Sequence, residues 1–496
     1  MKQLADLAFE NSYARLPSGM HARVRPTPLR GAHLASVSPA AAALLDLSPD
    51  VLRQQEAIAA LSGSRPLPDM DPIAMCYAGH QFGHFVPQLG DGRALVLGEV
   101  VTDAGAHWEL QLKGGGLTPF SRDGDGRAVL RSTIREYLCS EAMHGLGIPT
   151  TRALCLFGSD EEVYRERIER GALLVRMAPS HVRFGSFEVF YHRQQYRQLR
   201  QLADYVIDHD FPQLQDEERP YLALLREVVE RTARLMAQWQ LVGFAHGVMN
   251  TDNMSILGLT LDYGPFGFID TYDPGFICNH SDHHGRYAFD RQPSVGLWNL
   301  TCLAQALLPL LDADDVETSV EQAREALADY EPAFDAAYLS GMRAKLGLRE
   351  QRADDPALAA ALLDIMAANR VDYTNLFRDL ASLRLDGAAS DAALRDRFID
   401  RQAFDAWTDD YRARLRAEGR VDDAVRAAAM RAVNPRYVLR NYLAQQAIER
   451  AEQGDYAEVD RLLDLLSHPF DEQPERQAYA AEPPDWGRHL EVSCSS

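Results

Sequence analysis

The sequence lacks the features that would mark a membrane or secreted protein. No stretch approaches the roughly 18 consecutive apolar residues of a transmembrane helix. The N-terminal segment contains Asp6 and Glu10 and no apolar core region, which is not the pattern of a signal peptide. The six cysteines are scattered without a CxxC pair, which favours a reducing compartment over a disulfide framework or a zinc ribbon. We therefore expect a cytoplasmic protein with no membrane partner.

Positive charge is also scarce. The chain has 51 Lys and Arg against 72 Asp and Glu, a formal net charge of -21. This acidity disfavours nonspecific binding to nucleic acid or to anionic membranes. Any phosphate site must therefore be built from a local cluster of cations.

The chain of 496 residues is long enough for two lobes. Apolar runs and alternation predict strands at 94–100, 107–114 and 171–178, and helical spacing predicts a helix at 131–147. From about residue 195 the pattern is mostly helical, beginning with 222–243. The predicted fold class is α+β, with a strand-rich first lobe and a helical second lobe.

A glycine loop and a lysine–glutamate pair are the first candidates for a nucleotide site. Gly90 and Gly92 lie between apolar strands, where glycines let backbone N–H groups approach an anion closely. Lys113 ends the next predicted strand, and Glu136 lies on the following helix. In protein kinases a strand lysine pairs with a helix glutamate and holds nucleotide phosphates. The plainer alternatives are a hairpin turn and a surface lysine.

The segment HGVMNTDNMSILGLTLDYG carries the strongest motif. His246 and Asn253 have the spacing of a kinase catalytic loop, and Asp262 begins an Asp-Tyr-Gly where kinases have Asp-Phe-Gly. The residues between, 254–258 and 259–264, can form the hairpin that kinases place there. An amide oxygen and a carboxylate are suitable ligands for Mg²⁺ bound together with phosphate.

One departure from the kinase pattern bears on the reaction. The kinase base would lie two residues after His246, and that position is Val248, which cannot accept a proton. Asp252 is the nearby carboxylate that can, although a loop-capping role is the alternative.

Further cations and a glycine-rich insert surround these motifs. Arg93, Arg176 and Arg183 offer guanidinium groups that match phosphate geometry, although each alone is more often a surface or salt-bridge residue. The insert 114–131 contains Asp125 and Gly126, which can close over a nucleotide as a flap.

Two histidine-rich segments are weaker candidates. His80 and His84 are four residues apart, as metal ligands can be, but the glutamate of an HExxH motif is missing. The segment CNHSDHHG places Cys278, His280, Asp282, His283 and His284 together, and zinc is an alternative there. Because the segment follows Asp262, where kinases have a regulatory loop, we favour a regulatory loop over a zinc site.

The chain resembles the selenoprotein O (YdiU) family over essentially its whole length. The resemblance rests on YAGHQFGHFVPQLGDGRA, ELQLKGGGLTPFSRDGDGRAVLRSTIREYL, VRMAPSHVRFGSFE, HGVMNTDNMSILGLTLDYGPFGFID and PPDWGRHLEVSCSS. This family consists of kinase-like pseudokinases that bind ATP in an inverted pose and transfer AMP to Ser, Thr or Tyr hydroxyls of proteins. Uridylyl transfer from UTP with Mn²⁺ is also attributed to bacterial members.

The resemblance implies a protein-kinase-like bilobal fold and a role for each candidate residue. Residues 1–80 form an N-terminal extension, 81–190 the N-lobe, and 191–496 a helical C-lobe with a C-terminal tail. Asp252 is the proton acceptor, Asn253 and Asp262 bind Mg²⁺ or Mn²⁺, and Glu136 orients Lys113. The residues implied to contact the nucleotide are Gly90, Gly92, Arg93, Lys113, Asp125, Gly126, Arg176, Arg183 and Asp262.

Spacing alone leaves three classes open: a nucleotidyltransferase, a weak phosphotransferase and an inactive nucleotide-binding scaffold. The resemblance selects the first. A further hypothesis concerns redox control, because Cys494 lies in a C-terminal tail and Cys278 in the expected regulatory loop, whose polar neighbours predict exposure to solvent. A Cys278–Cys494 disulfide would report oxidation, and two unrelated thiols are the alternative.

Overall fold

The structure is a computed structural model that describes residues 2–387, 391–419 and 422–492. Within these residues, nine strands form one sheet in the order β2-β4-β7-β8-β11-β10-β3, with β1 paired to β7 and β9 to β11. Two short pairs, β5 with β6 and β12 with β13, lie apart from it. The strands are β1 (Ala8–Glu10), β2 (His21–Arg23), β3 (His33–Val37), β4 (Ile73–Met75), β5 (Gly79–Gln81), β6 (His84–Val86), β7 (Ala94–Val101), β8 (His107–Lys113), β9 (Ala128–Val129), β10 (Arg152–Tyr164), β11 (Ile168–Ala178), β12 (Phe244–Ala245) and β13 (Gly267–Phe268).

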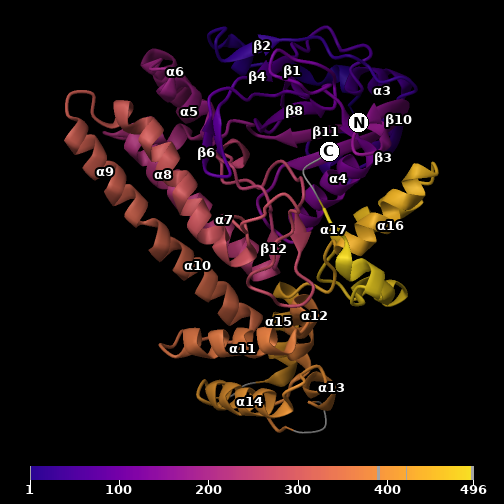
Figure 1. Cartoon of the computed structure of the whole chain (residues 1–496), viewed down its shortest axis with the longest axis vertical. Coiled ribbons are helices and arrows are strands. Elements are labelled where there is room, and N and C mark those ends of the chain that lie inside the picture. Colours follow the sequence, from indigo (N-terminus) through magenta and orange to yellow (C-terminus); the bar gives the residue numbers. More distant parts are fainter. Residues whose placement is uncertain (1, 388–390, 420–421, 493–496) are drawn as a thin grey trace.

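The rest of the described chain is mostly helical (Figure 1). The helices are α1 (Pro39–Ala43), α2 (Pro49–Leu52), α3 (Gln55–Leu61), α4 (Leu130–Gly145), α5 (Phe184–His192), α6 (Tyr196–Asp210), α7 (Pro220–Val242), α8 (Gln292–Leu311), α9 (Val316–Ala328), α10 (Tyr330–Lys345), α11 (Asp355–Asn369), α12 (Tyr373–Asp379), α13 (Ala392–Arg395), α14 (Arg401–Arg416), α15 (Asp423–Val433), α16 (Asn441–Glu452) and α17 (Ala457–Ser467). The fold is therefore mixed α/β with a large antiparallel sheet, and the strands and helices expected around 94–114, 131–147, 171–178 and 222–243 are confirmed.

Alternation along β8 and β11 decides which side chains reach the site. Successive side chains of a strand point to opposite faces of a sheet. Leu110 and Leu112 of β8 pack with α1–α3 in one hydrophobic cluster on one face. The polar residues between and after them, Gln111 and Lys113, therefore point to the other face, where α4 lies. Arg176 of β11 joins them, because it is in register with Gln111.

Helix α4 is held from both sides. Its Ile134, Tyr137 and Leu138 are fully buried against the sheet. On its other side it contacts α16 and α17, which come from the end of the chain (Figure 1). Gly145 of α4 lies so close to α17 that a Cβ there would be 2.2 Å from the carbonyl oxygen of Leu466. The C-terminal helices thus fix the helix that carries Glu136.

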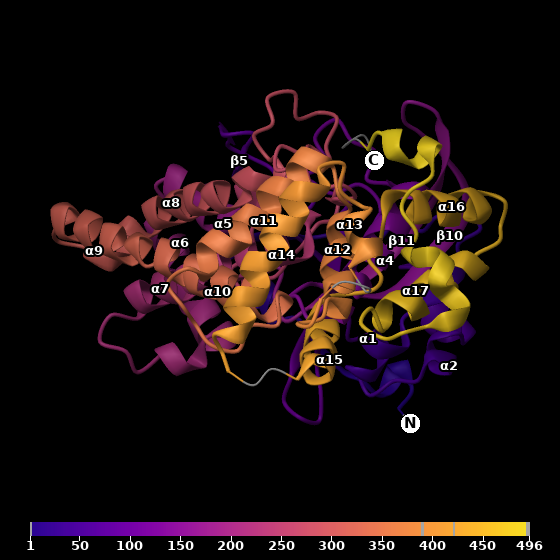
Figure 2. The same cartoon turned by 90° about the horizontal axis from the view of Figure 1, so that it is seen from below.

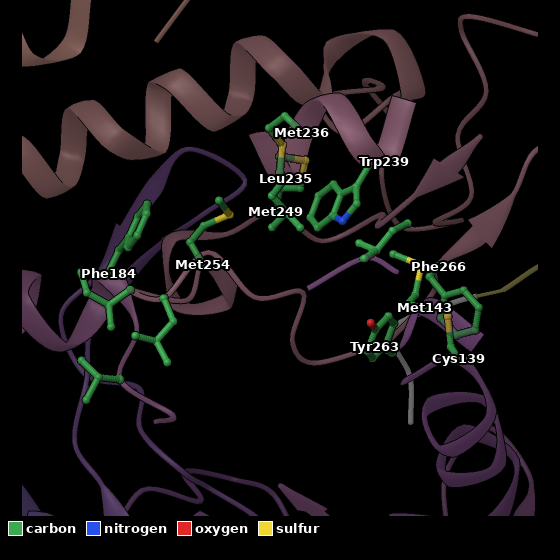
Figure 3. Packing of buried hydrophobic residues seen from close by; sticks show 14 of the residues in the cluster. Cys139, Met143, Phe184, Leu235, Met236, Trp239, Met249, Met254, Tyr263 and Phe266 are labelled. Carbon is green, nitrogen blue, oxygen red and sulfur yellow. The ribbon is translucent and has the colours of Figure 1, made fainter. Parts of the chain in front are cut away.

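A continuous hydrophobic core runs from α4 beneath the catalytic loop (Figure 3). Tyr263 and Phe266 lie beside Cys139 of α4, and the Trp239 ring of α7 stacks on His246 at 5.3 Å between centroids. Burial on this scale stabilises each large side chain by about 1.5–3 kcal/mol. The start of the catalytic loop is therefore rigidly supported.

Two segments of the described chain differ from a simple sequence interpretation. The hairpin expected over 254–264 does not form: Ser255 bridges to Arg183 and Thr260 to Thr150, so the segment pairs with other parts of the chain. The segment Phe289–Leu311, which contains α8, is long and apolar enough to cross a membrane by composition, but just over half of its most apolar window is buried inside the protein, as in a core helix.

Helices α11 to α15 form a further layer. Helices α11 and α14 lie side by side in Figure 2 and contact each other. Together with α12, α13 and α15 they bury their own hydrophobic cluster around Leu362, Phe377 and Tyr411. This layer contacts α10, which packs against α7, and its hydrophobic cluster also includes Ala245 of β12 and Cys278.

Candidate active site

Four charged side chains meet at the centre of the site. The Nζ of Lys113 lies 2.6 Å from Glu136 Oε2 and 2.6 Å from Asp262 Oδ1. The Nη1 of Arg176 lies 2.8 Å from Glu136 Oε1 and 2.9 Å from Asp262 Oδ1. Two cations and two carboxylates therefore alternate, which satisfies charges that would be costly to bury alone. The expected pairing of Lys113 with Glu136 is present.

The backbone of Asp262 is itself unusual. Its φ is +63°, in the left-handed region that non-glycine residues rarely adopt. Burial alone would raise the pKa of its carboxyl, but Lys113 and Arg176 outweigh burial and hold the pKa well below its ordinary value. The ionised form of Asp262, the form that can bind a metal ion, is therefore favoured.

The glycine loop and the first part of the insert 114–131 pack directly against each other. A Cβ on Gly90, whose φ is +109°, would lie 2.6 Å from the Phe120 ring, and a Cβ on Gly92 would lie 3.0 Å from the Phe120 carbonyl oxygen. A Cβ on Gly126, at φ +72°, would lie 2.2 Å from the backbone of Gly116. These three glycines permit close backbone contacts that other residues would prevent. The insert thus lies over the glycine loop as a flap.

Asp125 forms an ion pair with Arg165, in the turn between β10 and β11. Its carboxylate lies 2.7 Å from Arg165 Nη1 and accepts the backbone N–H of Arg127. This closes the flap toward the sheet. Asp125 and Arg165 both line the cavity described below.

The catalytic loop, residues 246–253, follows β12 and begins with His246. His246 is buried, its Nε2 lies 2.9 Å from the Leu261 carbonyl oxygen, and burial lowers its pKa. Val248 lines the cavity where a kinase would have its base. The Nδ2 of Asn253 donates to the Val248 carbonyl at 3.1 Å, which leaves the amide oxygen as the atom suited to a metal ion.

Asp252 is a buried carboxyl beside the cavity. Burial raises the pKa of its carboxyl to about 7, opposed by the positive charge of Arg183. Gln81 Nε2 donates to its Oδ2 at 3.3 Å, whereas its buried Oδ1 has no hydrogen-bond partner among the described residues. A carboxylate oxygen with no partner, next to a cavity, is a group suited to general-base chemistry.

A cavity of about 730 Å³ connects these groups. Ten of the sequence-predicted site residues line it, namely Gly90, Gly92, Arg93, Lys113, Asp125, Gly126, Arg176, Asp252, Asn253 and Asp262. Glu136 lines a smaller adjoining cavity of about 130 Å³. The volume and the polar lining suit a nucleotide.

Arg183 is the exception among the predicted nucleotide contacts. It is 1% exposed and lies behind the described lining of the cavity rather than in it. Its Nη1 donates to the backbone oxygen of Asp252 at 3.1 Å, and its guanidinium stacks on the Tyr77 ring at 4.5 Å. In this structure Arg183 therefore positions the catalytic loop.

Sequence reasoning missed Asp91, which lies between the two glycines. Its carboxylate accepts from the backbone N–H of Met75 at 3.1 Å, from Tyr77 Oη at 3.3 Å and from Gln111 Nε2 at 3.3 Å. These contacts tie the glycine loop to the sheet. The only signal for Asp91 in the sequence is its position between Gly90 and Gly92.

The histidine-rich segments do not form the metal sites that their spacing allowed. His84 is exposed and does not join His80, which lies 2.5 Å from Glu188 on α5 and gathers instead with Glu188 and Cys302 as potential metal ligands. In the later segment, the Asp282 carboxylate accepts the backbone N–H groups of Arg286 and Tyr287. The described part of the chain gathers no three potential metal ligands from Cys278–His284.

The prediction that Cys278 is exposed is wrong. It is 7% exposed, and its Sγ lies 3.5 Å from the Ala245 carbonyl oxygen. The segment packs against Gly247, where a Cβ would lie 2.6 Å from the Cys278 Sγ. Polar neighbours misled here, since Asn279 and Asp282 are buried as well. Cys494 lies outside the described residues, and the last described residues come to this loop: His280 N donates to Val492 O at 2.9 Å.

A glycine loop, a buried lysine–glutamate pair and a catalytic loop around a polar cavity define a nucleotide-dependent transferase. Residues 3–467 match the family described as protein adenylyltransferase SelO, and the chain belongs to that family. It is 62% identical to the protein nucleotidyltransferase YdiU of Myxococcus xanthus and 61% identical to that of Thioalkalivibrio sulfidiphilus, with both chains covered completely. The corresponding protein of Thiobacillus denitrificans is 60% identical, again over the full length of both chains. The chain is thus a protein nucleotidyltransferase.

Proposed function

We propose that the cavity binds ATP and that the chain transfers AMP to Ser, Thr or Tyr hydroxyls of proteins. One observation carries this proposal: Val248 replaces the kinase base, while Asp252 offers an unpartnered oxygen beside the same cavity that Lys113 and Asp262 line. UTP is a second candidate donor, since the described lining identifies no base-specific contact.

The proposed step is a displacement at the α-phosphorus. The acceptor hydroxyl gives its proton to Asp252 while its oxygen bonds to the α-phosphorus, and the bond to the bridging oxygen of pyrophosphate breaks. Lys113 and Arg176 lie where they can offset negative charge on the phosphates. Most of the rate enhancement then comes from positioning and charge stabilisation.

Asn253 and Asp262 are the residues that would hold Mg²⁺ or Mn²⁺. An amide oxygen and a permanently ionised carboxylate fit either ion, and phosphate oxygens would complete the coordination. The metal would neutralise charge on the phosphates. Because the chain supplies so few ligands, we expect metal binding to depend on the nucleotide.

The order of elements supports a kinase-like bilobal fold with segments 1–80, 81–190 and 191–496. The glycine loop, the lysine on β8, the glutamate on α4 and the catalytic loop follow one another as in kinases. A cytoplasmic location accords with the scattered cysteines.

The donor, metal and acceptor are tested together by mass spectrometry. The full-length protein is incubated with a cell extract and either ATP or UTP, with Mg²⁺ or Mn²⁺, and modified peptides are mapped. We expect AMP on Ser, Thr or Tyr side chains. Modification confined to other side chains, or UMP alone, would contradict the proposal, and the Asp262→Ala variant serves as the inactive control.

Redox control through Cys278 and Cys494 remains a proposal. Its support is the contact of the tail with the Cys278 loop, where His280 also lies 3.7 Å from Glu491. Non-reducing peptide mapping of mildly oxidised protein, with activity measured before and after a reductant, tests it. Two unbridged thiols, or activity indifferent to the reductant, would remove it.

A further inference from the structure

A second cavity of about 590 Å³ adjoins the nucleotide cavity. Phe82, in the turn between β5 and β6, lines both. The remainder of the second wall comes from the segment that follows Cys278 and from the start of α8, including Arg286, Arg291 and Val295. The two cavities therefore share the Phe82 side chain as part of their walls.

Phe82 is held in a strained and exposed conformation. Its φ is +49°, and its side chain is among the few large apolar ones that remain exposed, at 36%. Its backbone N–H lies 3.1 Å from Asn250 Oδ1 and 3.0 Å from Tyr287 Oη, and the Phe82 and Tyr287 rings are 5.1 Å apart. Such a conformation persists only where its surroundings enforce it, and it is concentrated at functional sites.

The position of Phe82 relates the second cavity to the reaction. The preceding residue, Gln81, donates to the Asp252 carboxylate, and Asn250 is two residues before Asp252. In this turn Gln81 contacts Asp252, and the next residue, Phe82, lies between the two cavities. The second cavity therefore lies on the side of this turn away from the nucleotide cavity that Asp252 lines.

The second cavity is positively charged in a strongly acidic protein. Neither Arg286 nor Arg291 forms an ion pair with any residue that the structure describes. The guanidinium of Arg286 stacks on Trp298 at 4.5 Å, and its buried Nε has no described hydrogen-bond partner. The one carboxylate in the lining, Asp282, accepts two backbone N–H groups. Exposed His283 and His284 add further donors.

We propose that this cavity is the docking site for the acceptor protein and that it selects an acidic segment beside the modified hydroxyl. The proposal rests on the function proposed above. Carboxylates of the acceptor would pair with Arg291 and Arg286, while Phe82 and Val295 contact its apolar groups. Two arginines without described acidic partners are suited to carboxylates, and complementary charge fixes the register of a docked chain.

The binding test uses three short fluorescent peptides that each contain one tyrosine, flanked by glutamates, glutamines or lysines. Fluorescence anisotropy with the full-length protein and a non-hydrolysable ATP analogue gives their affinities. We expect the glutamate peptide to bind at least about tenfold more tightly than the glutamine peptide, with the preference reduced at high salt. Equal affinities, no binding of any peptide, or tighter binding of the lysine peptide would overturn the proposal.

Two matched variants locate the binding site. Arg291→Gln changes an exposed residue immediately before α8 and should weaken binding of the glutamate peptide at least about fivefold, while leaving ATP affinity unchanged. Arg324→Gln makes the same change on α9, where the arginine is also exposed, and should have no effect. An unchanged affinity in Arg291→Gln would contradict the proposal.

The outcome is separable from that of the proposed function. Transfer of AMP to proteins is measured in parallel on the same preparations. If the acidic preference is absent while AMP is transferred, the docking site alone is wrong. If the preference and its dependence on Arg291 hold while another group is transferred, the docking site stands and the proposed reaction is wrong.

Discussion

The Nζ of Lys113 lies 2.6 Å from the carboxylate of Asp262, which joins the end of β8 to the Asp-Tyr-Gly segment. The two residues are 149 positions apart in the chain. Because Arg176 bonds the same carboxylate oxygen, the contact is part of a network and not an isolated pair. The residue proposed to bind phosphate and the residue proposed to bind metal are therefore electrostatically coupled.

Replacing Lys113 tests this coupling. Lys113→Met removes one of the two cations that face Asp262, so we expect ATP affinity to fall by at least about tenfold, or roughly 1.4 kcal/mol. Isothermal titration calorimetry with ATP and Mg²⁺ measures it. The chain has only three lysines, and Lys345→Met, on α10, is the matched control that should bind ATP normally. Equal affinities for the two variants would contradict the role of Lys113.

Asp252→Asn should separate binding from chemistry. The amide keeps the shape of the side chain but cannot accept the proton, so we expect transfer to fall by about 10²-fold or more. ATP affinity should stay within a few-fold of wild type, because Asp252 carries no bond to the Lys113 network. Single-turnover rates and calorimetry give the two quantities. Full activity in Asp252→Asn, compared with the exposed-surface control Asp410→Asn, would show that another group is the base.

Gly126→Ala should disturb the flap. The new Cβ would lie 2.2 Å from the Gly116 backbone at a φ of +72°, so the flap must move or the backbone must strain by about 1–3 kcal/mol. We expect weaker ATP binding and a lower melting temperature. Gly454→Ala has a similar φ, +86°, with nothing within 4 Å of the Cβ, and should leave ATP binding unchanged. Identical ATP affinities would mean that the flap does not contribute to the nucleotide site.

Lys345 predicts a pH dependence of stability. Burial lowers the pKa of its ammonium to about 7, and its Nζ lies over the rings of Phe377 and Tyr373 at 4.2 and 5.3 Å. Between pH 7 and its unfolded pKa of about 10.4, the unfolded chain binds more protons than the folded one, so stability rises with pH. This one group contributes at most about 1.4 kcal/mol per pH unit.

Lys345→Met should therefore raise the free energy of unfolding at neutral pH and remove that slope. Urea unfolding at several pH values between 7 and 10 measures both. A slope that persists unchanged in the variant would assign the pH dependence to other groups. Lys345 does not line the nucleotide cavity, so activity serves as the control.

Local sequence patterns predicted the elements of the site well. Strand alternation placed Lys113, and the spacing from His246 to Asn253 gave the catalytic loop, because these features depend on neighbouring residues. Long-range packing could not be predicted in this way. Nothing near β1 shows that it pairs with β7, and nothing near Glu136 shows that α16 and α17 support its helix.

The same limit applies to two individual residues. Arg183 was grouped with the predicted phosphate-binding arginines, and its bond to the backbone of Asp252, 69 residues away, could not be read from the sequence. Cys278 was predicted to be exposed from its polar neighbours, but those neighbours turn inward to bind backbone groups. The burial of a polar segment depends on which distant groups it meets, and sequence spacing does not contain that information.

The central claim is that the α-phosphate of the donor, and not its γ-phosphate, becomes attached to protein. The most direct measurement incubates the full-length protein and an acceptor extract with ATP labelled at either position and follows protein-bound label. The structure, with Val248 in place of the kinase base and Asp252 beside the cavity, predicts covalent label from α-labelled ATP alone. Protein-bound label from γ-labelled ATP would contradict the account and make the chain a phosphotransferase.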